Sequence, residues 1–378
     1  MGPKQTEAVV NWQEVRSLFP SLANKTFLNS ATMGQLPQSA SDAVMAHLQR
    51  RDYTAAVDAP KWFDDLDRLR AKLGKLVNAT ADDIAFIPST AHGLSIALNG
   101  IDWQPGDRII TLSPEFPNNT YAPSLLTRKG VEFIETPIED FAQHVNDRTR
   151  LVMVSALNYV TGFRAPLKEM RRLCPNALFY VDATQGCGAI EFDVQDLDID
   201  MLSVHGYKWM LSPTGAGFLF VKPSVRQWLE PNVIGWRSHH NWRDWSNLHH
   251  GMPEFSTAAE RYEGYFPAMP LYYAMEQSVD LFLKLGTATI EARVLELAAK
   301  LREKVEALGG TVEHLNSPVL ACRFPQMDSN QIAARLQERN IIVSARHGLL
   351  RVSVHLYNNE DDLDRFAEGI NHAMNLRA

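Results

Sequence analysis

The sequence predicts an α/β protein: a large domain with a mostly parallel sheet flanked by helices, followed by a smaller C-terminal α+β domain. Between about residues 80 and 222, short apolar runs alternate with amphipathic helical patterns. Strands that are apolar on both faces and separated by helices are typical of a parallel sheet covered on both sides. The expected strands are DDIAFIP, DRIITLS, TRLVMVSAL, ALFYVDAT, IDMLSVHG and GAGFLFVK.

The pattern changes near residue 285. Four further strands are expected, in TVEHL, PVLACRF, IIVSA and LLRVSVH. This mixture predicts an antiparallel sheet with helices on one face. We therefore expect a large domain at 51–285, a small domain at 286–378, and an N-terminal segment at 1–50 that packs with the small domain. The helices of the small domain are expected at 290–308, 330–339 and 360–374.

Charge and cysteine content narrow the classes of function. The 378 residues carry a formal net charge of −7, so no basic surface for nucleic acid or an anionic membrane is expected. Cys174, Cys187 and Cys322 form no CxxC pair, which argues against a disulfide framework or a Cys-based zinc site. No run approaches the roughly 20 apolar residues of a membrane-spanning helix, and residues 1–15 lack the apolar core of a signal peptide. We expect a cytoplasmic protein.

Two charged residues follow expected strands of the large domain. Open α/β sheets bind ligands at the carboxyl ends of their strands; Asp182 ends ALFYVD, and Lys208 follows IDMLSVH. Each has a simpler interpretation, Asp182 as a helix N-cap and Lys208 as a solvated surface charge. An aspartate here could instead keep a pyridinium nitrogen protonated. A lysine beside Trp209, Met210 and Leu211 can have its pKa lowered enough to become a nucleophilic amine.

Longer segments around these two residues resemble a known family. Asp182 lies in VDATQG and Lys208 in HGYKWMLSPTGAGFLFV, and the similarity extends from FLNSATMGQLP (27–37) to LRVSVHLYNNEDDLDRF (350–366). The chain resembles the class V aminotransferase family of fold-type I pyridoxal 5'-phosphate (PLP) enzymes, which includes cysteine desulfurases, kynureninases and isopenicillin N epimerase-like proteins. The resemblance implies a PLP enzyme whose large domain binds the cofactor.

The same resemblance implies roles around the cofactor ring. Lys208 would hold PLP as a Schiff base and then move the α-proton of the substrate, while Asp182 would pair with the ring nitrogen. Gln185 would hydrogen-bond the ring oxygen next to the Schiff base, and Asn158 would reach that oxygen or the substrate carboxylate. Phe116 would stack on the ring, where desulfurases carry His. The alternatives are loop polar groups for Gln185 and Asn158 and a core side chain for Phe116.

The phosphate of PLP is expected at IPSTAHGLSIA. This segment follows a strand and opens a helix, so its N–H groups and helix dipole suit a dianion, although a plain N-cap is the alternative. The residues expected to bind the phosphate are Thr90, Ala91 and His92, and His205 and Tyr207 from the lysine segment would close the site.

Arg351, which opens LRVSVHLYN, is the expected substrate-binding residue. The family uses an arginine at this point to bind the α-carboxylate with two hydrogen bonds, a geometry that lysine cannot match. A surface salt bridge is the alternative. The resemblance therefore implies a free α-amino acid as the substrate.

Three departures from the family pattern matter. The stretch IIVSARHGLLR has no cysteine, so a persulfide-forming desulfurase is not expected. The segment 255–271 is altered, which leaves open whether Ser256 or Thr257 contacts the partner's phosphate in the homodimer that the resemblance implies. The four histidines of 235–250 lack carboxylates at ligand spacing, so we expect no metal ion and interpret this loop as a substrate-pocket or subunit contact.

The reaction type stays open between related chemistries. Aminotransferase activity is favoured, and the alternatives are a C–S or C–C lyase, acting by β-elimination or in a kynureninase-like way, and an epimerase. A cofactor-free interaction or structural protein would predict loss of Lys208 or Asp182, and both are present.

Overall fold

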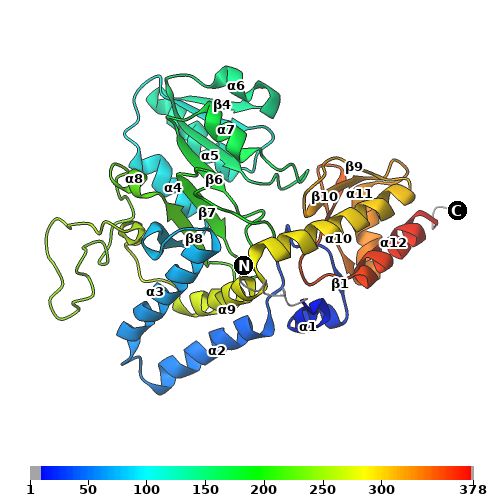
Figure 1. The fold of residues 1–378 in the computed structure, drawn as a ribbon, viewed down its shortest axis with the longest axis horizontal. Helices are drawn as coiled ribbons and strands as arrows, with labels where there is room; N and C mark the ends of the chain where they lie inside the picture. The colour runs from blue at the N-terminus through cyan, green and yellow to red at the C-terminus, as the bar shows by residue number, and fades with distance from the viewer. Residues whose placement is uncertain (1–9, 376–378) are drawn as a thin grey trace, which may run out of the picture.

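A seven-stranded sheet forms the centre of the larger part of the molecule (Figure 1). The computed structural model describes residues 10–375. The strand order is β2-β8-β7-β6-β5-β3-β4, and all strands are parallel except β8, which confirms the expected mostly parallel sheet. The strands are β2 (Ile84–Ile87), β3 (Arg108–Leu112), β4 (Glu132–Thr136), β5 (Thr149–Ser155), β6 (Leu178–Asp182), β7 (Met201–His205) and β8 (Gly217–Val221).

Both faces of this sheet are buried. Along β5, Val152 and Val154 join one apolar cluster, while Leu151 and Met153 join the other, on the face covered by α4. Two-sided burial explains why these strands are continuous apolar runs. The helices of this part and of the N-terminal segment are α1 (Trp12–Ser17), α2 (Gln38–Tyr53), α3 (Ala59–Leu76), α4 (Thr90–Gly100), α5 (Asn118–Ser124), α6 (Phe141–His144), α7 (Leu167–Leu173), α8 (Pro223–Arg226) and α9 (Met269–Leu285).

Strand β4 is the one strand of the large sheet that the sequence analysis missed. It lies at the sheet edge beside β3 only, with Glu132 and Glu135 exposed and Phe133 and Ile134 half-buried. Its apolar stretch is only two residues long and lies between two glutamates, so β4 lacks the continuous apolar run of the strands that are buried on both faces.

A smaller antiparallel sheet lies beside the large one, in the order β12-β13-β10-β9, as expected for an α+β unit (Figure 1). Gly286, with a φ of 83°, separates α9 from the first helix of this unit, and a side chain would strain that backbone conformation. The elements are α10 (Thr287–Ala307), β9 (Thr311–Val312), β10 (Val319–Arg323), α11 (Ser329–Glu338), β11 (Ile341–Ile342), β12 (Ser344–Arg346), β13 (Leu349–Ser353) and α12 (Glu360–Asn375).

The N-terminal segment contacts both parts. Its strand β1 (Thr26–Phe27) pairs in parallel with β11 of the small unit, and Asn29 forms a further bridge to Ser353. Helix α2 instead packs against α9. The three domain limits given by the sequence stay predictions. Within the described residues, no helix is both long and apolar enough to cross a membrane.

A buried ion network anchors the long loop between α8 and α9 to the large sheet. The Glu263 side chain is fully buried and accepts hydrogen bonds from the guanidinium groups of Arg70 and Arg237. It also accepts a bond of 2.7 Å from the backbone N–H of Phe86 in β2. Since each partner depends on the others for its charge balance, removing one leaves buried charges uncompensated.

Glu263→Ala is expected to lower the free energy of unfolding by about 3–5 kcal/mol, because Arg70 and Arg237 lose their fully buried counter-charge and keep the more exposed Glu260. The matched control is Glu132→Ala, which removes the exposed ion pair to Arg108 and should cost less than about 1 kcal/mol. Denaturant unfolding of both variants measures the difference. Equal losses of stability would contradict a structural role of the network.

Candidate active site

A pocket of about 200 Å³ opens at the carboxyl ends of the parallel strands. Its walls come from the ends of β5, β6 and β7, the start of α4 and the segment after β3. The lining residues are Ser89, Thr90, Phe116, Asn118, Ser155, Tyr159, Asp182, Thr184, Gln185, His205, Tyr207 and Lys208.

Lys208 stands in a turn just beyond β7, and the N-terminal segment packs directly on this turn. The N–H of Gly34 donates to the Tyr207 carbonyl over 2.9 Å. A Cβ atom on Gly34 would lie 1.9 Å from the Lys208 carbonyl oxygen, so only glycine permits this approach. The position of the lysine therefore depends on a segment more than 170 residues earlier in the chain.

The Lys208 amine is buried, with 7% of the residue exposed. Its Nζ lies 5.5 Å from the centre of the Phe116 ring, and no hydrogen bond from it is found within residues 10–375. Burial lowers the pKa of Lys208 to about 8; the Asp182 carboxylate opposes this shift, and the charges of Arg351 and Arg346 add to it. A neutral, weakly solvated amine is a competent nucleophile and base.

Asp182 ends β6 and is 5% exposed. Burial raises the pKa of its carboxyl group, while hydrogen bonds from Thr184 and the positive charge of Lys208 act in the opposite direction. The Thr184 N–H donates to Oδ1 over 2.9 Å. Within the described chain this carboxylate forms no ion pair, so a protonated ring nitrogen would supply a counter-charge that it lacks.

The start of α4 faces the same pocket. Ser89 caps the helix by accepting from the His92 N–H, which leaves the first N–H groups, at Thr90 and Ala91, without intrahelical acceptors. The Thr90 side chain lines the pocket, whereas those of Ala91 and His92 do not. The His92 ring packs instead against Tyr265, and its Nε2 atom is buried without a partner. Any role of Ala91 and His92 would therefore be through their backbone.

His205 and Tyr207 close this end of the pocket. The His205 Nε2 atom accepts a hydrogen bond of 3.1 Å from the Gly215 N–H, so Nδ1 carries the ring hydrogen in the neutral form. Burial lowers the pKa of His205 to about 4, with a smaller effect from Lys208. The ring is therefore neutral near pH 7 and serves as an N–H donor, packed 4.5 Å from the Tyr207 ring.

Gln185 lies in the pocket with both ends of its amide engaged. Its Oε1 accepts from the Trp209 indole over 2.6 Å, and its Nε2 donates to the Ala31 carbonyl over 2.9 Å. One Nε2 hydrogen remains for a ligand. This arrangement fixes the amide orientation before anything binds.

The structure does not place Asn158 in the pocket with Lys208. Its Nδ2 donates to the Pro114 carbonyl over 2.7 Å, and its Oδ1 accepts from the N–H groups of Val160 and Thr161. It borders a neighbouring cavity. In this structure Asn158 positions the loop through these hydrogen bonds, and its expected contact to the ring oxygen or the substrate carboxylate stays a prediction.

Arg351 reaches the site from β13 of the small sheet and is 2% exposed. Its guanidinium donates to the Tyr159 carbonyl over 2.6 Å and to the hydroxyl groups of Thr32 and Ser344. All of these acceptors are neutral, and no ion pair to Arg351 is found within residues 10–375. Burial lowers the pKa of Arg351 to about 10, and a buried cation without a counter-charge favours an anionic ligand.

Several lining residues were missed at the sequence level. Tyr159 contacts Phe116 with ring centres 5.2 Å apart, and Ser155 and Thr184 stand at strand ends. Glu115, with a pKa raised by burial, accepts from the Ser155 hydroxyl over 2.6 Å. The strand-end position was a usable signal for Ser155 and Thr184; nothing local distinguishes Tyr159.

The loop and segment that departed from the family pattern lie away from this pocket. No residue of 235–250 lines it, and Figure 1 shows the loop projecting from the large part on the side opposite the small sheet. Ser256 accepts from a nearby N–H, and the Thr257 carbonyl accepts from Arg226. Within the described residues, no group of three or more His, Cys, Asp or Glu side chains could hold a metal ion.

The three thiols are buried outside the pocket lining. Cys174, Cys187 and Cys322 are each at most 2% exposed, and burial raises the pKa of all three. None lines the pocket with Lys208. A thiol that is buried and protonated is chemically inert.

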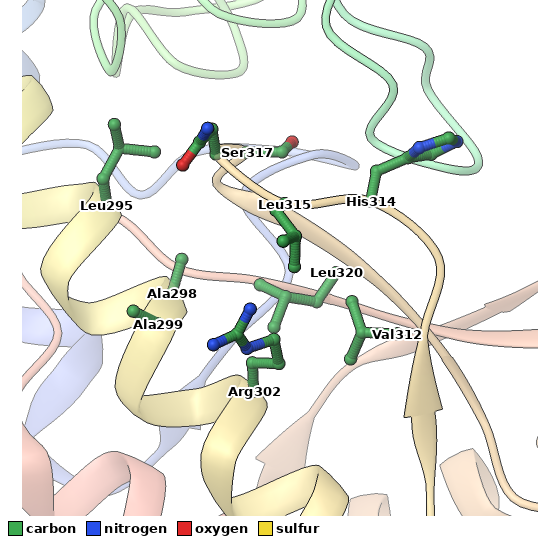
Figure 2. Close-up of a pocket in the computed structure, with 10 residues that line it drawn as sticks. Leu295, Ala298, Ala299, Arg302, Val312, His314, Leu315, Ser317 and Leu320 are labelled. Carbon is green, nitrogen blue, oxygen red and sulfur yellow. The ribbon is translucent and has the colours of Figure 1, made fainter.

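A second hollow lies in the small unit, between α10 and the connection from β9 to β10 (Figure 2). Figure 2 shows the Arg302 side chain reaching between Ala299 and Leu320. The other lining residues that the figure labels are Leu295, Ala298, Val312, His314, Leu315 and Ser317. None of the expected site residues lies there.

Comparison with known proteins shows the family of the chain. The model of the family described as aminotransferase class-V matches residues 26–366. The chain belongs to the class-V aminotransferase family. It is therefore an enzyme of the PLP-dependent aminotransferase and lyase type, and its cofactor is PLP.

Relatives within the family carry several different descriptions. An uncharacterized aminotransferase, YcbU of Bacillus subtilis, is 22% identical over 93% of this chain and 95% of its own. A probable cysteine desulfurase of Methanothermobacter thermautotrophicus is 23% identical over 94% and 96%. The isopenicillin N epimerase of Streptomyces clavuligerus is 27% identical over 96% and 98%. Family membership therefore leaves the specific activity open.

Solved structures share the fold. A mutant of C-DES, with glycine covalently linked to its PLP cofactor, superposes with a TM-score of 0.87 at 22% identity and covers 94% of this chain and 98% of its own. The cysteine desulfurase CsdA of Escherichia coli superposes with a TM-score of 0.85 at 20% identity, covering 98% and 100%. These likenesses confirm the expected fold.

The residues of the pocket fit PLP. A nucleophilic amine, an unpaired carboxylate and free helix N–H groups beside a neutral histidine donor occur in one pocket, at Lys208, Asp182, Thr90 and His205. They match, respectively, an aldehyde, a pyridinium nitrogen and a phosphate.

The pKa of Lys208 predicts how PLP attachment depends on pH. In the PLP-free protein, the neutral amine predominates only above a pKa of about 8. The rate of Schiff-base formation with added pyridoxal should therefore rise with pH up to about 8 and then level off. A stopped-flow absorbance series measures this rate. A profile that still rises at 10.5, the value of an ordinary lysine, would contradict the burial argument.

Proposed function

We propose that this enzyme acts on a free α-amino acid and is an aminotransferase. The observation that carries the proposal is Arg351, a buried cation with no counter-charge among residues 10–375, placed beside the pocket that contains Lys208. An α-carboxylate would satisfy it with two charge-assisted hydrogen bonds. A simple amine would leave it unpaired.

Each of three residues has a separate role in the proposed reaction. PLP, when bound, supplies an electron sink that makes the Cα proton of an amino acid removable. Lys208 would hold the cofactor through its side-chain amine, and the free amine, with a pKa lowered by burial to about 8, would take the Cα proton of the substrate. Asp182 keeps the ring nitrogen protonated, and Phe116 packs over the amine. In a transaminase, the same Lys208 amine would return the proton at a position other than Cα.

A C–S lyase is the second candidate. The solved neighbour C-DES is described as a cystine C–S lyase; its product complex superposes with a TM-score of 0.85 over 93% of this chain. Elimination needs the same proton removal by Lys208 and no enzyme thiol. A persulfide-forming desulfurase is not proposed, because no thiol lines the pocket. C–C cleavage and epimerisation would begin with the same step.

Lys208→Ala is expected to lose the visible absorbance of lysine-bound PLP and to lower turnover by at least about 10²–10⁴-fold, because the base is removed. The matched control is Lys129→Ala, at an exposed lysine. Product analysis with a panel of amino acids then separates the candidates: a keto acid with the amine passed to a second keto acid indicates transamination, whereas pyruvate, ammonia and sulfide indicate a lyase. Unchanged absorbance in Lys208→Ala would contradict the proposal.

We further propose that the chain forms a homodimer in the cytoplasm. Large apolar side chains are exposed on and after α2 and on the 235–250 loop and its continuation, including Tyr53 at 94%, Val57 at 80% and Met252 at 90%. Exposed apolar side chains that gather into one patch are typical of subunit contacts, and a contact between two copies would cover these. Free, buried thiols suit a reducing compartment.

Light scattering on the protein eluted from a size-exclusion column should give a mass twice the chain mass of 42.5 kDa. Met252→Lys should weaken the dimer, because it places a charge in the expected contact. A single-chain mass at every concentration would contradict the dimer.

A further inference from the structure

The segment IIVSARHGLLR, which contains no cysteine, forms a tight hairpin. Strands β12 and β13 are joined by two residues only, His347 with a φ of 46° and Gly348 with a φ of 78°. Two successive positive φ values are typical of a type I′ turn, whose twist matches that of the strands. The turn fixes the register: Arg346 lies opposite Leu349 and Ser344 opposite Arg351.

This register places Arg346 on the same face of the small sheet as Arg351. Directly opposite residues, and residues two apart on one strand, share a face. Ser344 faces Arg351, and Arg346 is two residues from Ser344. Arg346 and Arg351 are therefore diagonal neighbours, with Cα atoms about 7–8 Å apart, within reach of one another's long side chains.

That face meets the active-site pocket. Arg351 donates to the Tyr159 carbonyl, and the His347 ring nitrogen Nε2 lies 3.2 Å from the Tyr159 hydroxyl. Tyr159 itself lines the pocket. The charge of Arg346 is also one of the causes that lower the pKa of Lys208 and of Arg351, as proximity requires.

Neither arginine has a counter-charge in the part of the chain that the structure describes. Arg346 is exposed, and its guanidinium donates to the carbonyl of Ala345 over 3.2 Å. The acceptors of Arg351 are neutral. An α-carboxylate on Arg351 accounts for one of these two cations and leaves the second free.

We propose that Arg346 binds a carboxylate in the side chain of the substrate, so that the enzyme prefers acidic amino acids. This inference rests on the proposed function, because Arg351 must hold the α-carboxylate. The rigid hairpin presents the second guanidinium at the pocket edge, where a dicarboxylic amino acid can span both groups. A substrate with a neutral side chain would leave the Arg346 guanidinium without a counter-charge.

The first test uses probes that bind without reacting. Succinate and succinamate differ only in that one carboxylate is an amide. Calorimetry on the PLP-loaded enzyme should give a dissociation constant for succinate at least about tenfold lower, since a charge-assisted hydrogen bond is lost with the amide. L-aspartate against L-asparagine should show the same order in kcat/KM.

Substitutions then test whether Arg346 causes the preference for succinate over succinamate. Arg346→Gln should reduce the ratio between succinate and succinamate to about one, and Arg346→Lys should retain most of it, because the Coulomb attraction of a positive charge remains. Arg323→Gln is the control; it removes an exposed arginine of the same sheet that pairs with Glu313, and the ratio should not change.

The outcomes separate the two proposals. If the enzyme shows lysine-dependent PLP absorbance and processes amino acids, yet binds succinate and succinamate equally, the role of Arg346 is overturned and the proposed function stands. If Arg346→Gln leaves an existing preference intact, the role of Arg346 is overturned as well. If absorbance and turnover do not depend on Lys208, both proposals are overturned.

Discussion

Burial of the Lys208 amine is the constraint on which the rest of the site depends. A lysine in water is a cation and a poor nucleophile, and its removal from solvent is what brings its pKa down to about 8. The carboxyl edge of the large sheet cannot achieve this alone. Gly34 of the N-terminal segment seals the lysine turn on one side, and Phe116 covers the amine on another. The reactive group therefore forms only when distant parts of the chain have folded together.

Within the part of the chain that the structure describes, two buried charged groups of the site, Asp182 and Arg351, lack an ion-pair partner that a bound ligand would supply. Among the pocket-lining residues, Asp182 is the one carboxylate, and it stands opposite Lys208 with Arg351 close by. Burial disfavours the charged form of each of these groups. A pyridinium nitrogen for Asp182 and a carboxylate for Arg351 each convert an unpaired buried charge into a pair. Ligand binding should thus stabilise the fold, since only the folded state offers these partners.

Features that depend on a local residue pattern could be predicted from the sequence, whereas features that depend on contacts between distant residues could not. Two-sided burial leaves continuous apolar runs, and strand ends place Asp182, His205 and Lys208 at one edge, so the large sheet and the centre of the site were predictable. Strand β4 was missed because an edge strand lacks such a run. The orientation of Asn158 was not predictable, because its side chain bonds to Pro114, more than 40 residues earlier. Tyr159 depends on packing against the hairpin, which no local pattern encodes.

The β12–β13 hairpin explains how a chain with the same fold as cysteine desulfurases can support other chemistry. Activity resides in side chains placed on a shared framework, and likeness at about 20% identity concerns the framework. Here the connection before Arg351 has only His347 and Gly348 in the turn, so there is no flexible loop on which a thiol could move to the substrate. The rigidity that removes such a loop also fixes Arg346 beside Arg351. The hairpin thus places a fixed cation, and no thiol, next to Arg351, and the proposed preference for acidic substrates follows from that placement.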